Sequence, residues 1–348
     1  MKPRIKGSTT RILPVMPDMR DVALREIRLT RAAPPGKASV QGLRRETYGA
    51  AVQQFEELLS AAASVGPASR PLPLFYALSQ AGRAIVAAHG EEPEAFGHGL
   101  TEDRSDGEVA YLLQYRVKRS PAKTDLFGAV ARATRSGEIT GSVPLGAVWA
   151  ATPKTYRLPA DAWHDDWATA LKVGRSVAGA TGERLFVELL SMSGPPERDG
   201  VAGVQRRLQS YPTLPDNATK DVRAAEDLTE SGDWIVGASW SVEGEGRALD
   251  EVAPRTDLDG DRWLMPRLPG ESQLLSPLML WWVLLLGLSL LARYKPALWV
   301  QALTVDKSDR AVPLEVLLDQ GVEALPELVY SALIGSSYPI PPTLRAER

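Results

Sequence analysis

The feature that most constrains the fold is the apolar run at residues 278–292, LMLWWVLLLGLSLLA, in which Ser289 is the one hydrogen-bonding side chain apart from two indoles. Ser276 and Pro277 before it are typical of a helix start, because a hydroxyl caps free backbone amides and proline loses no hydrogen bond at the first position. Pro296 predicts the helix end. At about 1.5 Å per residue the run spans roughly 22 Å, whereas a bilayer core measures about 30 Å. The run therefore predicts a buried helix that the rest of the chain surrounds.

Charge is balanced over the whole chain but uneven along it. The formal net charge is −3, yet residues 1–45 carry eleven Lys or Arg against three acids, and residues 214–262 carry thirteen acids against five bases. Three interpretations stay open: the two segments attract each other, the basic one faces phosphate groups, or both are solvated charge.

The residue types that are missing exclude some classes of protein. The chain has no cysteine, which excludes disulfides and thiolate metal sites. The N-terminal segment has basic residues but no apolar stretch typical of a secretory signal. With 348 residues the chain can form one large domain or two ordinary ones. We therefore expect a soluble cytoplasmic protein that crosses no membrane.

Apolar residues at helical spacing predict further helices over residues 43–65, 71–89 and 312–333. The second of these is apolar nearly all round, so we expect neighbours to cover most of it. It also carries a stripe of small residues that lets another helix approach closely: Ala77, Ala81, Ala84 and Ala88. We expect this helix to pack against the helices at 43–65 and 278–292, so that distant segments share one core.

The other segments predict mixed structure. Four of them suggest strands, of which the last two should pair with each other: 22–31, 109–118, 233–242 and 262–265. Short helices are expected at 144–151 and 163–177, whereas 184–192 fits a strand or a helix.

These patterns predict a mainly α (α+β) protein. Its helical core would come from residues 42–90 and 276–335, with a mixed α/β insertion at 91–275 between them. Prolines and charge indicate that residues 1–41 form a basic, extended N-terminal arm and residues 336–348 a flexible tail.

Few patterns indicate metal or cofactor chemistry. The three histidines, His89, His98 and His164, are not at metal-ligand spacing. Dinucleotide-binding, phosphate-loop and nucleophile-elbow motifs do not occur in the sequence. We therefore expect neither a metal nor a cofactor.

The helix at 71–89 carries the most informative polar residues. Tyr76, Gln80 and Arg83 lie at i, i+4 and i+7, on one face of this helix. A guanidinium in an apolar helix needs an acceptor, because an unpaired buried charge is costly. Arg83 therefore either fastens helices together through a carboxylate or carbonyl groups, or binds an external anion such as phosphate.

Two family resemblances rest on this region. The stretch LFYALSQAGRAIVAAHG, followed by GHGL, resembles the helix and turn of the HEPN superfamily, in which an arginine precedes a histidine with four to six residues between them. Arg83 and His89 have five residues between them. The same stretch, together with LLLGLSLLARYKPALWV, resembles the YaaC-like family.

The HEPN resemblance implies a HEPN-like helical core and a metal-independent endoribonuclease that acts as a homodimer in stress response or phage defence. It implies catalytic roles for Arg83, which would stabilise phosphate charge, and for His89, which would transfer a proton or orient the 2′-hydroxyl. The substrate-binding residues that we expect beside them are Tyr76, Gln80, His98 and Arg293.

Three functional hypotheses stay open at this stage. The first is an RNA-directed protein of the kind that the HEPN resemblance implies. The second is a non-catalytic interaction or scaffold protein, which would meet protein partners through the basic N-terminal arm or the C-terminal tail. The third is a nucleotide-binding module with a pocket around Arg83.

Overall fold

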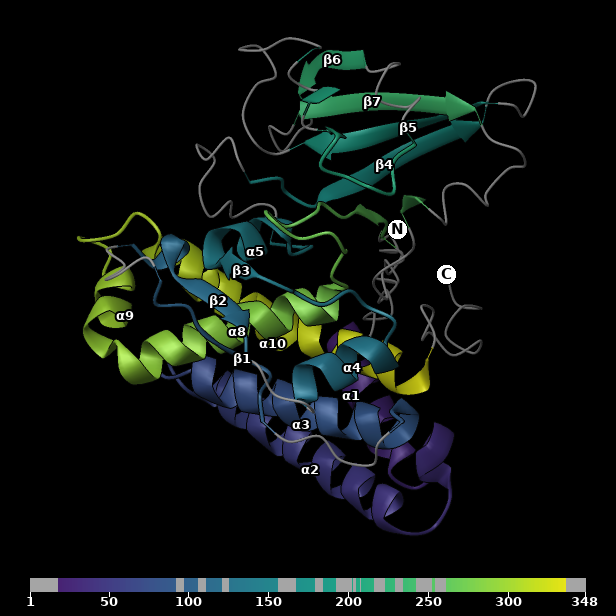
Figure 1. Cartoon of the computed structure of the whole chain (residues 1–348), viewed down its shortest axis with the longest axis vertical. Helices are drawn as coiled ribbons and strands as arrows, with labels where there is room; N and C mark the ends of the chain where they lie inside the picture. Colours follow the sequence, from purple (N-terminus) through teal and green to yellow (C-terminus); the bar gives the residue numbers. More distant parts are fainter. Residues whose placement is uncertain are drawn as a thin grey trace, which may run out of the picture.

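The computed structural model describes residues 18–91, 97–105, 111–120, 125–155, 167–178, 184–191, 202, 205–206, 208–215, 223–228, 234–241, 252–253 and 261–335. These residues form a mainly helical body and a separate layer of strands beyond it (Figure 1). The expectations for residues 1–17, for the tail at 336–348 and for His164 lie outside the described residues.

The helical body contains long helices from both ends of the chain. The α-helices are α1 (Met19–Thr30), α2 (Leu43–Ser64), α3 (Pro71–His89), α4 (Leu126–Ala133), α5 (Leu145–Ala151), α8 (Pro277–Tyr294), α9 (Pro296–Ala302) and α10 (Ala311–Ile334). Two short 3-10 helices, η1 (Gly36–Ser39) and η2 (Leu112–Gln114), lie between them in the sequence.

The strands form two antiparallel sheets. The small sheet lies against the helices in the order β1 (Leu100–Glu102), β2 (Arg116–Arg119), β3 (Ser142–Pro144). The larger sheet has the order β6 (Arg223–Leu228), β7 (Trp234–Ser241), β5 (Arg184–Ser191), β4 (Leu171–Ala178), β8 (Trp263–Leu264).

Helix α8 is the centre of the core, as the apolar run predicts. It contacts α3, α4, α5 and α10 as well as strands β1 and β2. Within the described part of the chain it is the one helix long and apolar enough to cross a membrane, with a mean hydropathy of 1.5, but 72% of it is buried inside the protein. Such burial is typical of a core helix, because a spanning helix exposes its apolar surface to lipid.

The predicted helices at 43–65, 71–89, 144–151 and 312–333 are confirmed as α2, α3, α5 and α10. The predicted contacts of α3 with α2 and with α8 are confirmed as well. Gly82 shows how close the second contact is, because a Cβ atom placed there would lie 2.4 Å from the Trp282 ring. Helices from distant segments therefore share one core.

The predicted strand at 22–31 is wrong, because these residues belong mostly to helix α1. Asp18 accepts a hydrogen bond from the Arg20 amide at 3.0 Å, which caps the helix start. Val22, Ala23 and Ile27 are buried, and α1 packs against α10. Tertiary packing thus orders the described part of the segment expected to be an extended arm.

Three other local predictions differ from the structure. Residues 171–177, expected to be helical, form most of β4. The segment at 109–118 contains η2 and then β2 instead of one strand. Strands β7 and β8 are in one sheet but are not paired with each other, because β5 and β4 lie between them.

The start of α8 also differs from the prediction that the Ser276 hydroxyl caps this helix. Ser276 is its N-cap residue, but its side chain makes no capping hydrogen bond. The Ser276 backbone amide instead donates to Ser136 Oγ at 2.8 Å, which ties the start of α8 to the segment after α4.

Candidate functional site

A group of polar side chains gathers where α3, the end of α8 and the segment before β1 meet. We call Tyr76, Arg83, His98 and Arg293 the cationic cluster. Arg293 Nη1 donates to the Tyr76 hydroxyl at 3.3 Å, and Arg293 Nε donates to the Ser289 carbonyl at 3.2 Å. Arg83 and Arg293 both act electrostatically on His98. The fold therefore brings together residues that lie far apart in the sequence.

The backbone around His98 is fixed by two glycines. Gly97 and Gly99 have φ angles of 75° and 78°, which side chains other than glycine rarely adopt. The carbonyl of Gly97 accepts from the Leu126 amide at 3.1 Å, and that of Gly99 accepts from the Ser120 amide at 2.9 Å. His98 is thus held in the sequence GHG by hydrogen bonds on both sides.

The environment of His98 keeps its imidazole neutral. Burial lowers the pKa of His98 from its ordinary value of 6.5, and the positive charges of Arg293 and Arg83 lower it further. Its ring lies edge-on against Phe75, with 5.2 Å between the centroids. At neutral pH this side chain can therefore accept a proton while two guanidinium groups act on it.

Among the described residues, the acidic side chain nearest in the sequence to this loop is Glu102, and it pairs with other cations. Glu102 accepts from Lys295 Nζ at 2.9 Å and from Arg104 Nε at 2.9 Å. Burial raises the pKa of Glu102, but these hydrogen bonds outweigh burial, so its pKa is lowered. Glu102 is thus matched by Lys295 and Arg104, and neither of these two ion pairs involves Arg293.

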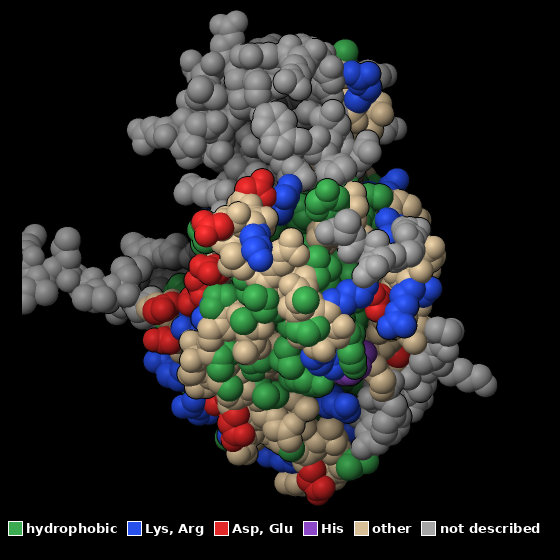
Figure 2. Space-filling model, turned by 90° about the vertical axis from the view of Figure 1, so that its left-hand side faces the viewer, with side chains coloured by type: hydrophobic (Ala, Val, Ile, Leu, Met, Phe, Trp, Pro, Cys, Tyr) green, Lys and Arg blue, Asp and Glu red, His purple; other side chains and the backbone are tan. Residues whose placement is uncertain are grey.

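Three described tyrosines are exposed to solvent, and two of them, Tyr76 and Tyr294, lie near Arg293. The exposed fraction is 37% for Tyr76, 64% for Tyr294 and 68% for Tyr111. Arg293 Cζ lies 5.9 Å from the ring centroid of Tyr76 and 5.1 Å from that of Tyr294. Figure 2 shows a face of the molecule on which hydrophobic side chains gather beside Lys, Arg and one His side chain. Exposed aromatic rings beside cations are typical of surfaces that stack nucleic-acid bases.

The structure places the other predicted site residues differently. Gln80 lies on α3 one turn after Tyr76 and is half-buried. His89 Nε2 lies 2.6 Å from the carbonyl oxygen of Leu333 at the end of α10. Arg83 and His89 therefore turn to different neighbours, and within the described chain it is His98 that joins Arg83.

His89 lines a separate cavity of about 870 Å³. The cavity lies between the ends of α3, α4 and α10 and the start of α8, and its lining also includes Arg132, Arg135 and Trp263. His89 thus lines a second cavity and does not belong to the cationic cluster.

Sequence reasoning missed Lys295 and Glu102 beside the cluster, and it did not single out the exposed Tyr111. The run RYK at the end of the apolar helix is a signal for Lys295, because three consecutive polar residues there must reach solvent. Among the described residues there is no group of three His, Cys, Asp or Glu side chains that could hold a metal ion.

Comparison with known proteins gives one match. The family model described as YaaC-like Protein matches residues 35–333, which is most of the chain. Neither the curated proteins nor the solved structures contain a significant match.

Proposed function

The chain belongs to the YaaC-like family, and from the geometry of its cationic cluster we propose that it binds single-stranded RNA. The observation that carries the proposal is the convergence of two arginines on His98 beside exposed tyrosines. Guanidinium groups bind phosphate, and tyrosine rings stack on unpaired bases. A-form duplexes offer no splayed bases, so a single strand fits this surface better.

We further propose that the helical core is HEPN-like and that the cluster cleaves the RNA without a metal, as in phage defence or stress response. His98 accepts the proton of a ribose 2′-hydroxyl, and the 2′-oxygen attacks the adjacent phosphorus. The bond from phosphorus to the 5′-oxygen breaks, and that oxygen takes a proton from water. The hydroxide so formed takes the proton held by His98, which restores water and the neutral imidazole. The products are a 2′,3′-cyclic phosphate and a 5′-hydroxyl end, while Arg83 and Arg293 stabilise the charge on the phosphorus oxygens.

Loss of either arginine is expected to weaken RNA binding. A charged hydrogen bond contributes about 1.5–3 kcal/mol, so Arg83→Ala and Arg293→Ala should each raise Kd roughly 10- to 100-fold. Fluorescence anisotropy with a labelled 12-nucleotide RNA, carrying 2′-O-methyl groups that prevent cleavage, measures this.

The matched control for these variants is Arg25→Ala. Arg25 is an exposed arginine of α1, with an exposed side-chain fraction of 63%. Its loss removes the same charge and should change Kd little. Equal effects of all three substitutions would contradict a specific site, because they would show that only total charge matters. Thermal unfolding of each variant separates loss of binding from loss of fold.

A protein-interaction role is the second candidate, and exposed valines favour it. Val300, Val305 and Val312, near the ends of α9 and α10, have exposed fractions of 54%, 66% and 53%. Apolar side chains that gather on a surface are typical of interfaces. The partner that we propose is a second copy of the chain. A light-scattering mass of a monomer, unchanged in Val300→Glu, would contradict this role.

A further inference from the structure

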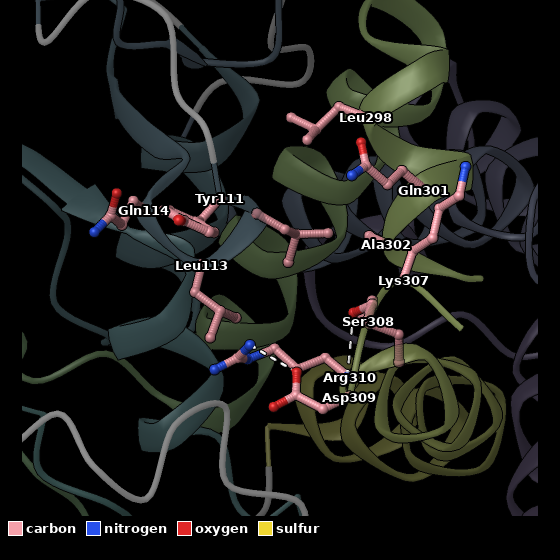
Figure 3. Close-up of a pocket in the computed structure, with 12 residues that line it drawn as sticks. Tyr111, Leu113, Gln114, Leu298, Gln301, Ala302, Lys307, Ser308, Asp309 and Arg310 are labelled. Carbon is pink, nitrogen blue, oxygen red and sulfur yellow. Dashed lines mark hydrogen bonds and ion pairs between the residues drawn. The ribbon is translucent and has the colours of Figure 1, made fainter. Parts of the chain in front are cut away.

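A cavity of about 550 Å³ opens between η2 and α9 (Figure 3). Its walls come from Tyr111 and η2 on one side, and from α9 and the segment before α10 on the other. This volume lies within the range of small-molecule sites, about 300–1,000 Å³. None of the residues predicted from the sequence to form a site lines it.

The cavity has an apolar floor and a polar rim. Leu112 and Leu113 of η2 are 7% and 5% exposed, and both line the cavity together with Leu298 of α9. In Figure 3 the amide of Gln301 points from α9 toward the space between the two walls. The ring of Tyr111 at the rim is left exposed by the rest of the protein. Together these groups suit a ligand that has a flat ring with polar atoms at its edge.

The segment before α10 adds two cationic side chains, Arg310 and Lys307, to the lining. Arg310 extends beneath Leu113, and its Nη1 contacts Asp309 Oδ1 at 2.9 Å. The ammonium of Lys307 turns outward from the same segment. A purely hydrocarbon ligand would leave the Gln301 side-chain amide without a hydrogen-bond partner from the ligand, which is costly when the amide is desolvated. A nucleobase meets the apolar floor, the aromatic ring and the amide together.

Two chain segments link the walls of the cavity to the end of α8. Tyr115 directly follows η2, and Lys295 Nζ lies 5.6 Å from its ring centroid. Lys295 follows the end of α8 beside Arg293, and α9, which supplies Leu298, begins at the next residue. Both walls of the cavity therefore adjoin Lys295, which follows Tyr294 and Arg293 in the chain.

We propose that this cavity, the Tyr111 pocket, holds one base of the RNA strand whose phosphates contact the cationic cluster. The inference rests on the proposed function for its substrate class and adds the place where a base is bound. Tyr111 stacks on the base, Gln301 offers one donor and one acceptor to its edge, and the leucines cover its face. The base in the pocket belongs to a different nucleotide from the one whose 2′-hydroxyl gives its proton to His98.

Removal of the Tyr111 ring tests the pocket. Stacking on one base is worth about 1–3 kcal/mol, so Tyr111→Ala in the full-length protein should raise Kd for the uncleavable 12-nucleotide RNA roughly 5- to 100-fold. Tyr111→Phe should bind like the parent, because the ring remains. Gln301→Ala should weaken binding less than Tyr111→Ala. Val40→Ala is the control, since Val40 is an exposed apolar residue that does not line the pocket.

The outcomes separate this inference from the proposed function. If RNA binds in a manner that depends on Arg83 but Tyr111→Ala binds as tightly as the parent, the base pocket is wrong and the proposed function stands. If the parent protein binds no RNA, both are wrong. Because the Tyr111 side chain is mostly exposed, its removal should leave the thermal unfolding midpoint unchanged, which a melting curve verifies.

Discussion

His98→Gln is expected to lower the rate of RNA cleavage about 10²- to 10⁴-fold in buffer that contains EDTA. Glutamine keeps a polar side chain of similar size, but its amide cannot take the proton of the 2′-hydroxyl. RNA binding should persist, because Arg83 and Arg293 remain. Single-turnover cleavage of a 12-nucleotide RNA measures the rate, and gel separation identifies the cyclic phosphate end.

The matched control is His89→Gln, which replaces the other described histidine. His89 contacts the Leu333 carbonyl, away from the cluster, so this variant should cleave like the parent. The HEPN resemblance assigns the proton transfer to His89 instead. Loss of cleavage in His89→Gln with full activity in His98→Gln would therefore contradict the site proposed here.

The pH dependence of cleavage follows from the lowered pKa of His98. A general base works in its neutral form, so kcat/KM should rise with pH through the pKa of His98 and then level off. That pKa lies below its ordinary value of 6.5, so the plateau should be reached by neutral pH. Arg293→Gln removes a positive charge that lowers this pKa, and the rising limb should move to higher pH.

Gly82→Leu is expected to destabilise the protein by about 3 kcal/mol or more, because new carbons cannot enter a packed core without displacing neighbours. A Cβ atom at Gly82 would lie 2.4 Å from the Trp282 ring and 3.0 Å from Val130 Cγ2. Trp282 is fully buried, so its ring has no free space to enter. Chemical denaturation followed by tryptophan fluorescence measures the change in the free energy of unfolding.

Gly49→Leu is the control for this experiment. Gly49 lies inside α2, and a Cβ atom there would meet no other atom within 4 Å. Leucine forms helix better than glycine, so this variant should be neutral or more stable. Gly82→Ala should also lose stability. In the double variant Gly82→Ala/Trp282→Phe, the smaller ring should restore part of that loss. Equal stability of Gly82→Leu and the parent would show that α3 and α8 do not pack as closely as described.

The long helices could be predicted from the sequence because their apolar residues carry a strong local signal. The run at 278–292 and the alanine stripe of the helix at 71–89 indicate both the two helices and their contact. The strand order could not be predicted in this way. Apolar residues mark β7 and β8 as strands, but the placing of β4 and β5 between them depends on tertiary packing.

The candidate site was predicted only in part. Tyr76 and Arg83 could be predicted because they share one face of a helix, which is a local pattern. Arg293 could be predicted because it directly follows the apolar run. The choice between His89 and His98 depends instead on the turn after α3. Glycines with positive φ on both sides of His98 set the direction of its backbone, which no helical periodicity describes. Tyr111 directly precedes η2, and its place at the cavity opposite α9 depends on the packing of η2 against that helix.

The most direct test of the central claim is to map where RNA touches the protein. We would irradiate the full-length protein bound to a single-stranded RNA that carries 4-thiouridine, and identify the crosslinked peptides by mass spectrometry. The account predicts crosslinks in the peptides that contain Tyr76, Tyr294 and Tyr111, all reduced in Arg83→Ala. Crosslinks confined to the basic residues 1–45, with the peptides of α3 and α8 unmodified, would contradict it.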